Sequence, residues 1–283
     1  MQIIVGKTAG FCFGVKNAVI KAKEETKKSK PIYCLGELVH NAQVTEELTE
    51  KGIQFVDNID GVKGRVIIRS HGVTKETYKK AENKNIEIVD LTCPKVLKIH
   101  NIAEEYSNKD YYIFLIGNKD HPEVIGTASF CGNNYSIVEE TETVEQALLD
   151  FREAKKEKIL IISQTTYSIE KFNKIVEKIK QEVFSEILEI KNTICNATKE
   201  RQEETKAIAQ QVDLMIIIGG KHSSNSNKLY ELSKQYCSRV LFIETHEELD
   251  LEKIKSANKI GIMAGASTPQ RSIEEVIEML NKM

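Results

Sequence analysis

Three cysteines share one spacing to a glycine that follows them. The pairs, each 24 residues apart, are Cys12 and Gly36, Cys93 and Gly117, and Cys195 and Gly219. In every interval a helix-length segment comes directly after the cysteine, and an apolar run then leads to the glycine. This self-similarity predicts three related units. A helix N-terminus directly after each cysteine favours the thiolate over the thiol.

Three soft thiolates without a fourth form an unusual set of metal ligands. Structural zinc takes four protein ligands, usually in C-x-x-C pairs, and the sequence has no such pair. An iron-sulfur cluster held by three cysteines keeps one iron open, and an open iron can act as a Lewis acid on a substrate. We therefore expect one 4Fe-4S cluster on Cys12, Cys93 and Cys195. On spacing alone, three merely structural cysteines remain an alternative.

The other three cysteines, Cys34, Cys131 and Cys237, lie outside the repeat. We expect them to be buried free thiols that act as small hydrophobic side chains.

Short β-branched runs alternate with helix-length segments along the chain, which indicates an α/β fold with mainly parallel sheets. The nine runs are IYCL, RVIIRS, IEIVDL, YYIFLIG, KILIIS, LEI, LMIIIGG, RVLFIE and KIGIMAG. A chain of 283 residues has room for two or three domains. The repeat predicts three similar α/β domains at residues 13–95, 96–194 and 195–283, the last completed by residues 1–12.

Polar side chains follow several of these runs, at the strand ends where ligands bind in open α/β sheets. They include His40, His71, His121 and Glu123, and the segments SQTT, KHSSNS and AGAST. His40 and His121 are 81 residues apart, as are Cys12 and Cys93, and the third unit offers Ser223, Ser224 and Asn225 instead. Histidines, hydroxyls and an amide beside helix N-termini suit a diphosphate.

Each of these residues also has an ordinary structural explanation. A histidine at a strand end is often a hydrogen-bonded structural residue, and Ser/Asn clusters are often helix caps. His100, His222 and His246 fall outside the repeated pattern, and we expect no site role for them.

Composition excludes some classes of partner. Lys and Arg total 40 against 42 for Asp and Glu, so a net charge of -2 provides no general attraction to nucleic acid or to an anionic membrane. No apolar run is long enough to span a bilayer, and the N-terminus lacks the features of a signal peptide. We expect a cytoplasmic protein.

Nine motifs together resemble one known family, the LytB family of 4-hydroxy-3-methylbut-2-enyl diphosphate reductases from the non-mevalonate pathway of isoprene biosynthesis. In chain order they are AGFCFGV, GELVHN, RSHGV, LTCPKV, DHPEV, SQTT, ICNAT, GGKHSSNS and GAST-P. GELVHN departs slightly from the commoner wording, with Glu37 and Val39 where Pro and Ile are frequent, but its histidine is intact.

The resemblance implies a pseudo-threefold trefoil of three α/β domains around a 4Fe-4S cluster with Cys12, Cys93 and Cys195 as ligands. It assigns Glu123 and Thr165 to proton relay and to orienting the substrate hydroxyl. The implied diphosphate contacts are His40, His71, His121, Ser223, Ser224, Asn225 and Ser267.

The implied reaction is a two-electron reductive dehydroxylation at the open iron that yields isopentenyl and dimethylallyl diphosphate. Because the sequence has no flavin or nicotinamide fingerprint, we expect an external electron donor, and the resemblance implies that it is ferredoxin or flavodoxin. Two alternatives remain open, a non-catalytic iron-sulfur redox sensor and a cluster-dependent hydro-lyase. A hydro-lyase would turn over without reductant.

Overall fold

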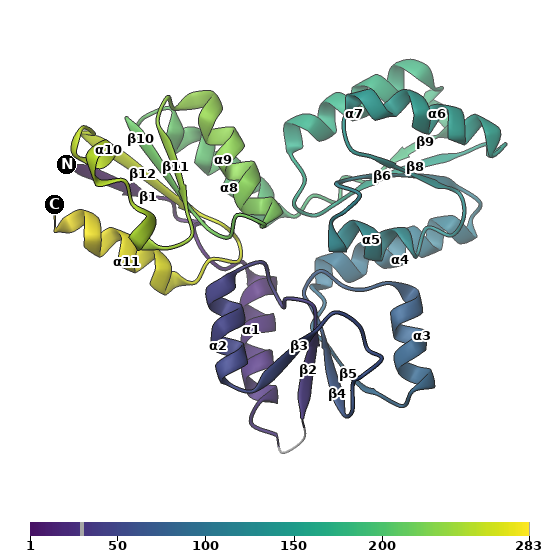
Figure 1. Ribbon diagram of the computed structural model, residues 1–283. Helices are drawn as coiled ribbons and strands as arrows, with labels where there is room; N and C mark the ends of the chain where they lie inside the picture. Colours follow the sequence, from purple (N-terminus) through teal and green to yellow (C-terminus); the bar gives the residue numbers. More distant parts are fainter. Residues whose placement is uncertain (29–30, 283) are drawn as a thin grey trace. The chain divides into compact units, whose positions relative to one another are not determined.

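Within the residues that the structure describes, the fold is built from three four-stranded sheets, and every strand pairing in them is parallel (Figure 1). The computed structural model describes residues 1–28 and 31–282, without the side chain of Ser185. The α/β class with parallel sheets that the sequence predicted is confirmed.

The first sheet has the strand order β3-β2-β4-β5, the second β7-β6-β8-β9 and the third β11-β10-β12-β1. The strands of the first sheet are β2 (Ile32–Leu35), β3 (Ile53–Val56), β4 (Arg65–Ile68) and β5 (Glu87–Asp90). Those of the second are β6 (Tyr112–Ile116), β7 (Tyr135–Val138), β8 (Ile159–Ser163) and β9 (Leu188–Ile190). Those of the third are β1 (Gln2–Val5), β10 (Leu214–Ile218), β11 (Val240–Ile243) and β12 (Lys259–Ala264).

Helices connect the strands. In the first half of the chain they are α1 (Phe13–Glu25), α2 (Ala42–Glu50), α3 (Lys75–Asn83), α4 (Pro94–Asn108), α5 (Pro122–Ala128) and α6 (Val144–Glu153). The later ones are α7 (Ile169–Glu182), α8 (Asn196–Ala209), α9 (Ser224–Tyr236), α10 (Leu251–Lys255) and α11 (Gln270–Asn281). Short 3-10 turns are η1 (Thr141–Thr143), η2 (Ser185–Ile187) and η3 (His246–Glu248).

The three glycines of the repeat occupy the same place in the three sheets. They directly follow β2, β6 and β10, which stand second in the strand orders given above. Each glycine donates its N–H to the carbonyl of the last residue of the neighbouring edge strand. The bonds are Gly36 to Val56 at 2.8 Å, Gly117 to Val138 at 3.1 Å and Gly219 to Ile243 at 2.9 Å. In the third sheet, β1 takes the edge position that β5 and β9 hold in the others. The N-terminal strand therefore completes a sheet that is otherwise made by the C-terminal part of the chain.

Internal contacts divide the chain into two compact units. One contains Met1–Val19, Val39–Glu50 and Asn196–Met283, with the third sheet; the other contains Ile20–Leu38 and Lys51–Cys195, with the first two sheets. The three domain boundaries expected from the sequence stay a prediction.

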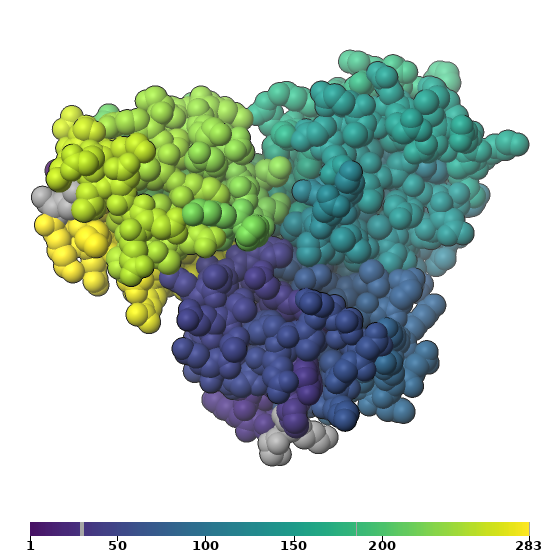
Figure 2. Space-filling model, in the orientation of Figure 1, coloured from purple at the N-terminus to yellow at the C-terminus, as the bar shows by residue number. Residues whose placement is uncertain are grey.

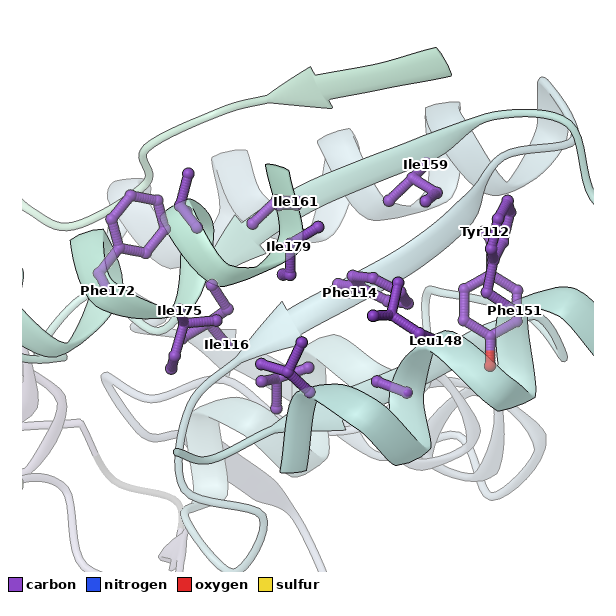
Figure 3. Packing of buried hydrophobic residues seen from close by; sticks show 14 of the residues in the cluster. Tyr112, Phe114, Ile116, Leu148, Phe151, Ile159, Ile161, Phe172, Ile175 and Ile179 are labelled. Atoms are coloured by element: carbon purple, nitrogen blue, oxygen red, sulfur yellow. The ribbon is translucent and has the colours of Figure 1, made fainter. Parts of the chain in front are cut away.

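Apolar clusters cover both faces of the second and third sheets, and one apolar cluster packs on a face of the first sheet. On one face of the second sheet, Phe114 on β6 packs edge-on against Tyr112 and against Phe151 of α6 (Figure 3). Phe172 and Ile175 of α7 complete this cluster. In the space-filling view, side chains cover the sheets from the side seen (Figure 2). Because these strands are buried on both faces, they read in the sequence as continuous apolar runs.

Within the described residues, no helix combines the length and the apolar character that crossing a membrane requires.

Candidate functional site

Each of the three repeat cysteines stands directly before a helix. Cys12 precedes α1 and Cys195 precedes α8, while Cys93 is the N-cap of α4 with Pro94 at the first helical position. Proline is favoured there because the first turn of a helix has no use for its missing N–H. The first backbone N–H groups of a helix and its dipole stabilise a negative charge at this end. All three positions thus suit thiolates.

The backbone of each cysteine is hydrogen-bonded to a loop at the end of a strand. Cys12 N–H donates to the carbonyl of Ala266 at 3.2 Å, two residues beyond β12. Cys93 N–H donates to Ser70 at 3.0 Å, two residues beyond β4, and Cys195 N–H to Thr165 at 3.0 Å, two residues beyond β8. The same backbone contact occurs in all three sheets, and each accepting residue is, or directly precedes, a residue expected to bind substrate.

The remaining cysteines differ in their surroundings. Cys34 and Cys131 are fully buried, and burial raises the pKa of both thiols to about 12. Cys237 is also buried, and no disulfide joins any of the six cysteines. Cys12, Cys93 and Cys195 are only half-buried. A set of three accessible soft donors at helix N-termini fits an iron-sulfur cluster, whereas protonated, enclosed thiols do not.

At the ends of β10 and β12, Ser267 and His40 lie together. The Ser267 hydroxyl donates to the carbonyl of His40 at 3.1 Å. Gly220 permits this packing, because a Cβ there would lie only 2.7 Å from the same carbonyl oxygen. The next residue, Asn41, accepts from Val44 N at 3.0 Å and fixes the start of α2. The sequence analysis placed His40 and His121 at equivalent positions of two units. In the structure, His121 is the N-cap of α5, whereas Asn41 and not His40 accepts a hydrogen bond at the start of α2, so the two histidines have different roles.

Helix α9 begins at the same strand end. Ser223 is its N-cap and accepts from Ser226 N at 3.3 Å, as the alternative explanation of a cap expected. Asn225 lies in the first turn and is 4% exposed. Neither its amide oxygen nor its amide nitrogen makes a hydrogen bond within the described part of the chain. Burying such a group without a partner is costly, so an orphaned amide at a helix start is suited to bind a polar ligand.

His71 sits on a tightly bound turn after β4. The preceding Ser70 donates both its N–H and its hydroxyl to the carbonyl of Leu38, at 3.2 and 2.9 Å. Gly72 follows with a φ of 74°, a conformation that favours glycine, and a Cβ there would lie 2.8 Å from the His100 ring. The backbone on both sides of His71 is thus fixed.

His121 meets the His71 ring edge-on, with centroids 5.5 Å apart. His121 is the N-cap of α5, and its Nδ1 accepts from the N–H of Glu123 at 3.1 Å. Because Nδ1 is the acceptor, the neutral ring carries its proton on Nε2. The ring therefore offers an N–H donor on its far side.

Glu123 is 1% exposed, and its carboxylate accepts two short hydrogen bonds from Thr165. The backbone N–H of Thr165 donates to Oε1 and the hydroxyl donates to Oε2, both at 2.6 Å. Burial raises the pKa of Glu123 to about 7 against the opposing effect of these bonds. A carboxyl group with a pKa near 7 can both give and take a proton at neutral pH, which is what a general acid requires.

Sequence reasoning missed a residue that supports this pair. Gln164 is buried, accepts from Asn118 N at 3.2 Å and donates to the Thr166 hydroxyl at 2.9 Å. It thereby ties the SQTT segment to the loop after β6. Its place directly after a buried strand was the available signal. His100 is buried and stacked on Phe130, with centroids 4.4 Å apart, in keeping with the structural role expected for it.

Comparisons with known proteins agree on one family. The family model described as LytB protein matches residues 3–281. A 4-hydroxy-3-methylbut-2-enyl diphosphate reductase of Caldanaerobacter subterraneus is 44% identical and covers 100% of this chain and 98% of its own. The protein of the same name from Clostridioides difficile is 43% identical, with 100% of both chains covered.

Two solved structures are similar to the whole fold. The E-1-hydroxy-2-methyl-but-2-enyl-4-diphosphate reductase of Plasmodium falciparum has a TM-score of 0.91 at 30% identity, covering 98% of this chain and 87% of the other. A second structure is described as (E)-4-hydroxy-3-methyl-but-2-enyl diphosphate reductase, the terminal enzyme of the non-mevalonate pathway. It has a TM-score of 0.72 at 39% identity, with both chains fully covered.

Proposed function

Because the chain belongs to the LytB family, we propose that it is an iron-sulfur oxidoreductase that reduces (E)-4-hydroxy-3-methylbut-2-enyl diphosphate to isopentenyl and dimethylallyl diphosphate. The reaction consumes two electrons and two protons, breaks the bond between C4 and its hydroxyl oxygen, and releases that oxygen as water. This is the last step of the non-mevalonate pathway.

One observation carries the proposal. In each of the three sheets, the N–H of the candidate ligand cysteine is bonded to the loop that bears a candidate substrate residue, Ser267, His71 or Thr165. A cofactor on the cysteines and a substrate on these loops would then be held by the same backbone contacts.

Cys12, Cys93 and Cys195 would hold a 4Fe-4S cluster. When bound, the cluster would supply the electrons and an open iron that polarises the substrate hydroxyl as a Lewis acid. Electrons would come from an external donor of the ferredoxin or flavodoxin class. The absence of disulfides among the six cysteines is in keeping with a reducing cytosol, where we place the reaction.

The chain's own residues bind and protonate the substrate. His121, through its Nε2–H, would donate to the diphosphate oxygens together with His40 and His71. Ser223, Ser224 and Asn225 would bind the same group at the start of α9, and Ser267 would do so beside His40. Fixed donors hold the substrate in one orientation, which lowers the entropic part of the barrier.

Glu123 would provide the proton. Its carboxyl group, with a pKa near 7, is partly protonated at neutral pH, and the Thr165 hydroxyl at 2.6 Å fixes its orientation. The same hydroxyl would orient the substrate alcohol toward Glu123. The burial of the pair keeps water from competing for the proton.

The function is tested by anaerobic turnover of the hydroxylated diphosphate with dithionite and a viologen mediator. We expect turnover only with reductant. Turnover without reductant would identify a hydro-lyase, and no reaction in protein with full iron and sulfide would refute the enzyme.

Asn225→Leu tests the anion site separately. Leu has a similar size and removes two buried unpartnered polar atoms, so we expect the free energy of unfolding to rise by about 1 kcal/mol or more while affinity for inorganic diphosphate falls about tenfold. His71→Ala should weaken diphosphate binding without stabilising the protein. Unchanged diphosphate affinity in both variants would contradict the proposed anion site. Urea unfolding and calorimetric titration measure the two quantities.

A further inference from the structure

The segment that carries Cys12 is the longest of the three that lead from an edge strand to a ligand cysteine. Six residues, 6–11, separate β1 from Cys12, against two between β5 and Cys93 and four between β9 and Cys195. A longer loop has more conformational freedom to lose, and this one contains Gly6 and Gly10. The loop before Cys12 therefore needs more contacts to hold it in one conformation than the segments before Cys93 and Cys195.

Two side chains of α8 fix this loop. Arg201 donates through Nε to the carbonyl of Thr8 at 2.9 Å and through Nη2 to the carbonyl of Gly10 at 2.8 Å. Glu204 accepts from Lys7 N at 2.7 Å, from Thr8 N at 2.8 Å and from the Thr8 hydroxyl at 2.5 Å. The backbone groups of Thr8 are thus held from both sides by side chains almost 200 residues away in sequence.

The two residues can act together because they are three positions apart, on one face of the helix. Arg201 is 3% exposed, and its Nη1 also donates to Ala197 O at 3.2 Å, so its charge is solvated by three carbonyl oxygens. Gly6 allows Glu204 and Met263 to lie close to the loop, because a Cβ at this position would be 2.0 Å from the sulfur of Met263 and 3.2 Å from Glu204. Because Arg201 is buried and donates to two main-chain carbonyls of this loop, its charge serves to hold the loop.

The other two cysteine segments have anchoring contacts of shorter range in the sequence. Thr92 N donates to Asp90 at 2.9 Å just before Cys93, and the Thr193 hydroxyl donates to Ser163 O at 2.5 Å just before Cys195. The Cys12 segment differs from both, because charged side chains of a helix almost 200 residues away hold it. That helix is the one that starts directly after Cys195.

We propose that Arg201 and Glu204 are positioning residues for the Cys12 ligand. They hold the loop before Cys12 against α8, the helix that starts directly after Cys195. The inference rests on the proposed function, since it concerns one thiolate of the cluster. Loss of either side chain leaves Cys12 in place in the sequence but frees its loop. The cluster then forms on a less rigid ligand and is lost more readily.

The test compares Arg201→Lys and Glu204→Gln with Thr205→Ala. Lysine keeps the charge but not the two-pronged geometry, and glutamine keeps the size but offers one oxygen in place of two. Thr205→Ala is the matched control: its buried hydroxyl bonds only within α8, to Arg201 O at 2.7 Å, so its removal should destabilise the helix without releasing the loop.

After anaerobic reconstitution, the decay of visible absorption in a chelator gives the rate of cluster loss. We refer to Arg201→Lys and Glu204→Gln as the clamp variants. We expect both clamp variants to load iron and then lose the cluster about tenfold faster than Thr205→Ala, at a similar melting temperature, because each lost bond involves a charged group. Their reduced clusters should also show an altered EPR spectrum. In the apo-protein, amide hydrogen exchange at Lys7 and Thr8 should accelerate in the clamp variants alone.

The outcomes separate the two ideas. If the wild type takes up no iron and sulfide, the proposed function fails. If the wild type loads normally but both clamp variants match Thr205→Ala in cluster loss and in exchange at Lys7 and Thr8, the positioning role is wrong. Should Arg201→Lys not fold, Thr8→Val removes a hydroxyl contact to Glu204 from the loop side, and the same readouts apply.

Discussion

Replacing Glu123 by Gln changes both the pH dependence of stability and the reaction rate. In the folded protein, burial raises the pKa of Glu123 from 4.5 to about 7. This rise in the pKa corresponds to about 3 kcal/mol, which is the cost of ionising this carboxyl inside the fold. Since the pKa is raised, the stability from the neutral form is fully present below about pH 4.5 and is lost as the pH rises through 7.

Glutamine stays neutral at every pH in this range. Its oxygen can accept from Thr165 N, and its NH₂ can donate to the Thr165 hydroxyl, so both contacts of the native side chain have a counterpart. We expect the difference in unfolding free energy between Glu123→Gln and wild type to move in favour of the variant by up to about 3 kcal/mol between pH 4.5 and pH 8.

Urea unfolding of the apo-proteins across this range measures the difference. Asp120→Asn, an exposed neighbour, is the control and should show little change. A difference that is flat with pH would refute the argument that burial controls this carboxyl group.

Glu123→Gln should also retain its cluster and bind substrate, yet turn over about a hundredfold to ten-thousandfold more slowly, because Gln cannot transfer a proton. Anaerobic kinetics measure the rate, and a spectroscopic shift of the cluster measures binding. Wild-type turnover in this variant would mean that the proton comes from elsewhere, such as a diphosphate oxygen or an ordered water.

Three further predictions concern other residues of the site and its support. Cys93→Ser should abolish cluster loading while Cys131→Ser does not, as measured by iron content after anaerobic reconstitution, because an alcohol is a poor replacement for a soft ligand; full loading in Cys93→Ser would count against the ligand assignment. Thr165→Val should lower the turnover number more mildly than Glu123→Gln with little effect on affinity, and a wild-type rate would show that the hydroxyl is dispensable. Burial lowers the pKa of His100 to about 4, so the folded protein keeps the ring neutral and its free energy of unfolding decreases by up to about 3 kcal/mol as the pH falls from about 6.5 to 4. His100→Leu should lose this acid sensitivity in urea unfolding, and an unchanged pH profile would contradict the argument.

Most of the fold could be predicted because the central strands of its sheets are buried. The runs that form β6, β8 and β10 consist almost entirely of apolar residues, and all are fully buried. Strands β1, β3 and β7 were absent from the nine expected runs, although residues 1–12 were expected to complete the third domain. All three are edge strands of four residues whose burial is incomplete, and Gln54 and Ser136 interrupt the apolar pattern of β3 and β7. A short half-buried strand has too few apolar residues to be distinguished from a loop.

The candidate site could be predicted where chemistry requires a particular residue type at a strand end or before a helix. Cys93, His121 and Glu123 are of this kind, and the structure puts them there. Arg201 and Glu204 could not be predicted, because an Arg and a Glu on a polar helix are usually solvent-exposed. Their role depends on a loop almost 200 residues earlier, and such a contact leaves no local pattern in the sequence.

The pairing of β1 with β12 has a consequence for the order of events during synthesis. The first strand leaves the ribosome long before its partner, Lys259–Ala264, exists. At about 5–20 residues per second, the N-terminal segment waits roughly 13 to 50 seconds for a sheet to join. Its contacts with α8 must wait almost as long. The first and second sheets can fold while translation continues, but the loop of Cys12 acquires its fixed shape only after Arg201, Glu204 and Ala266 have been made.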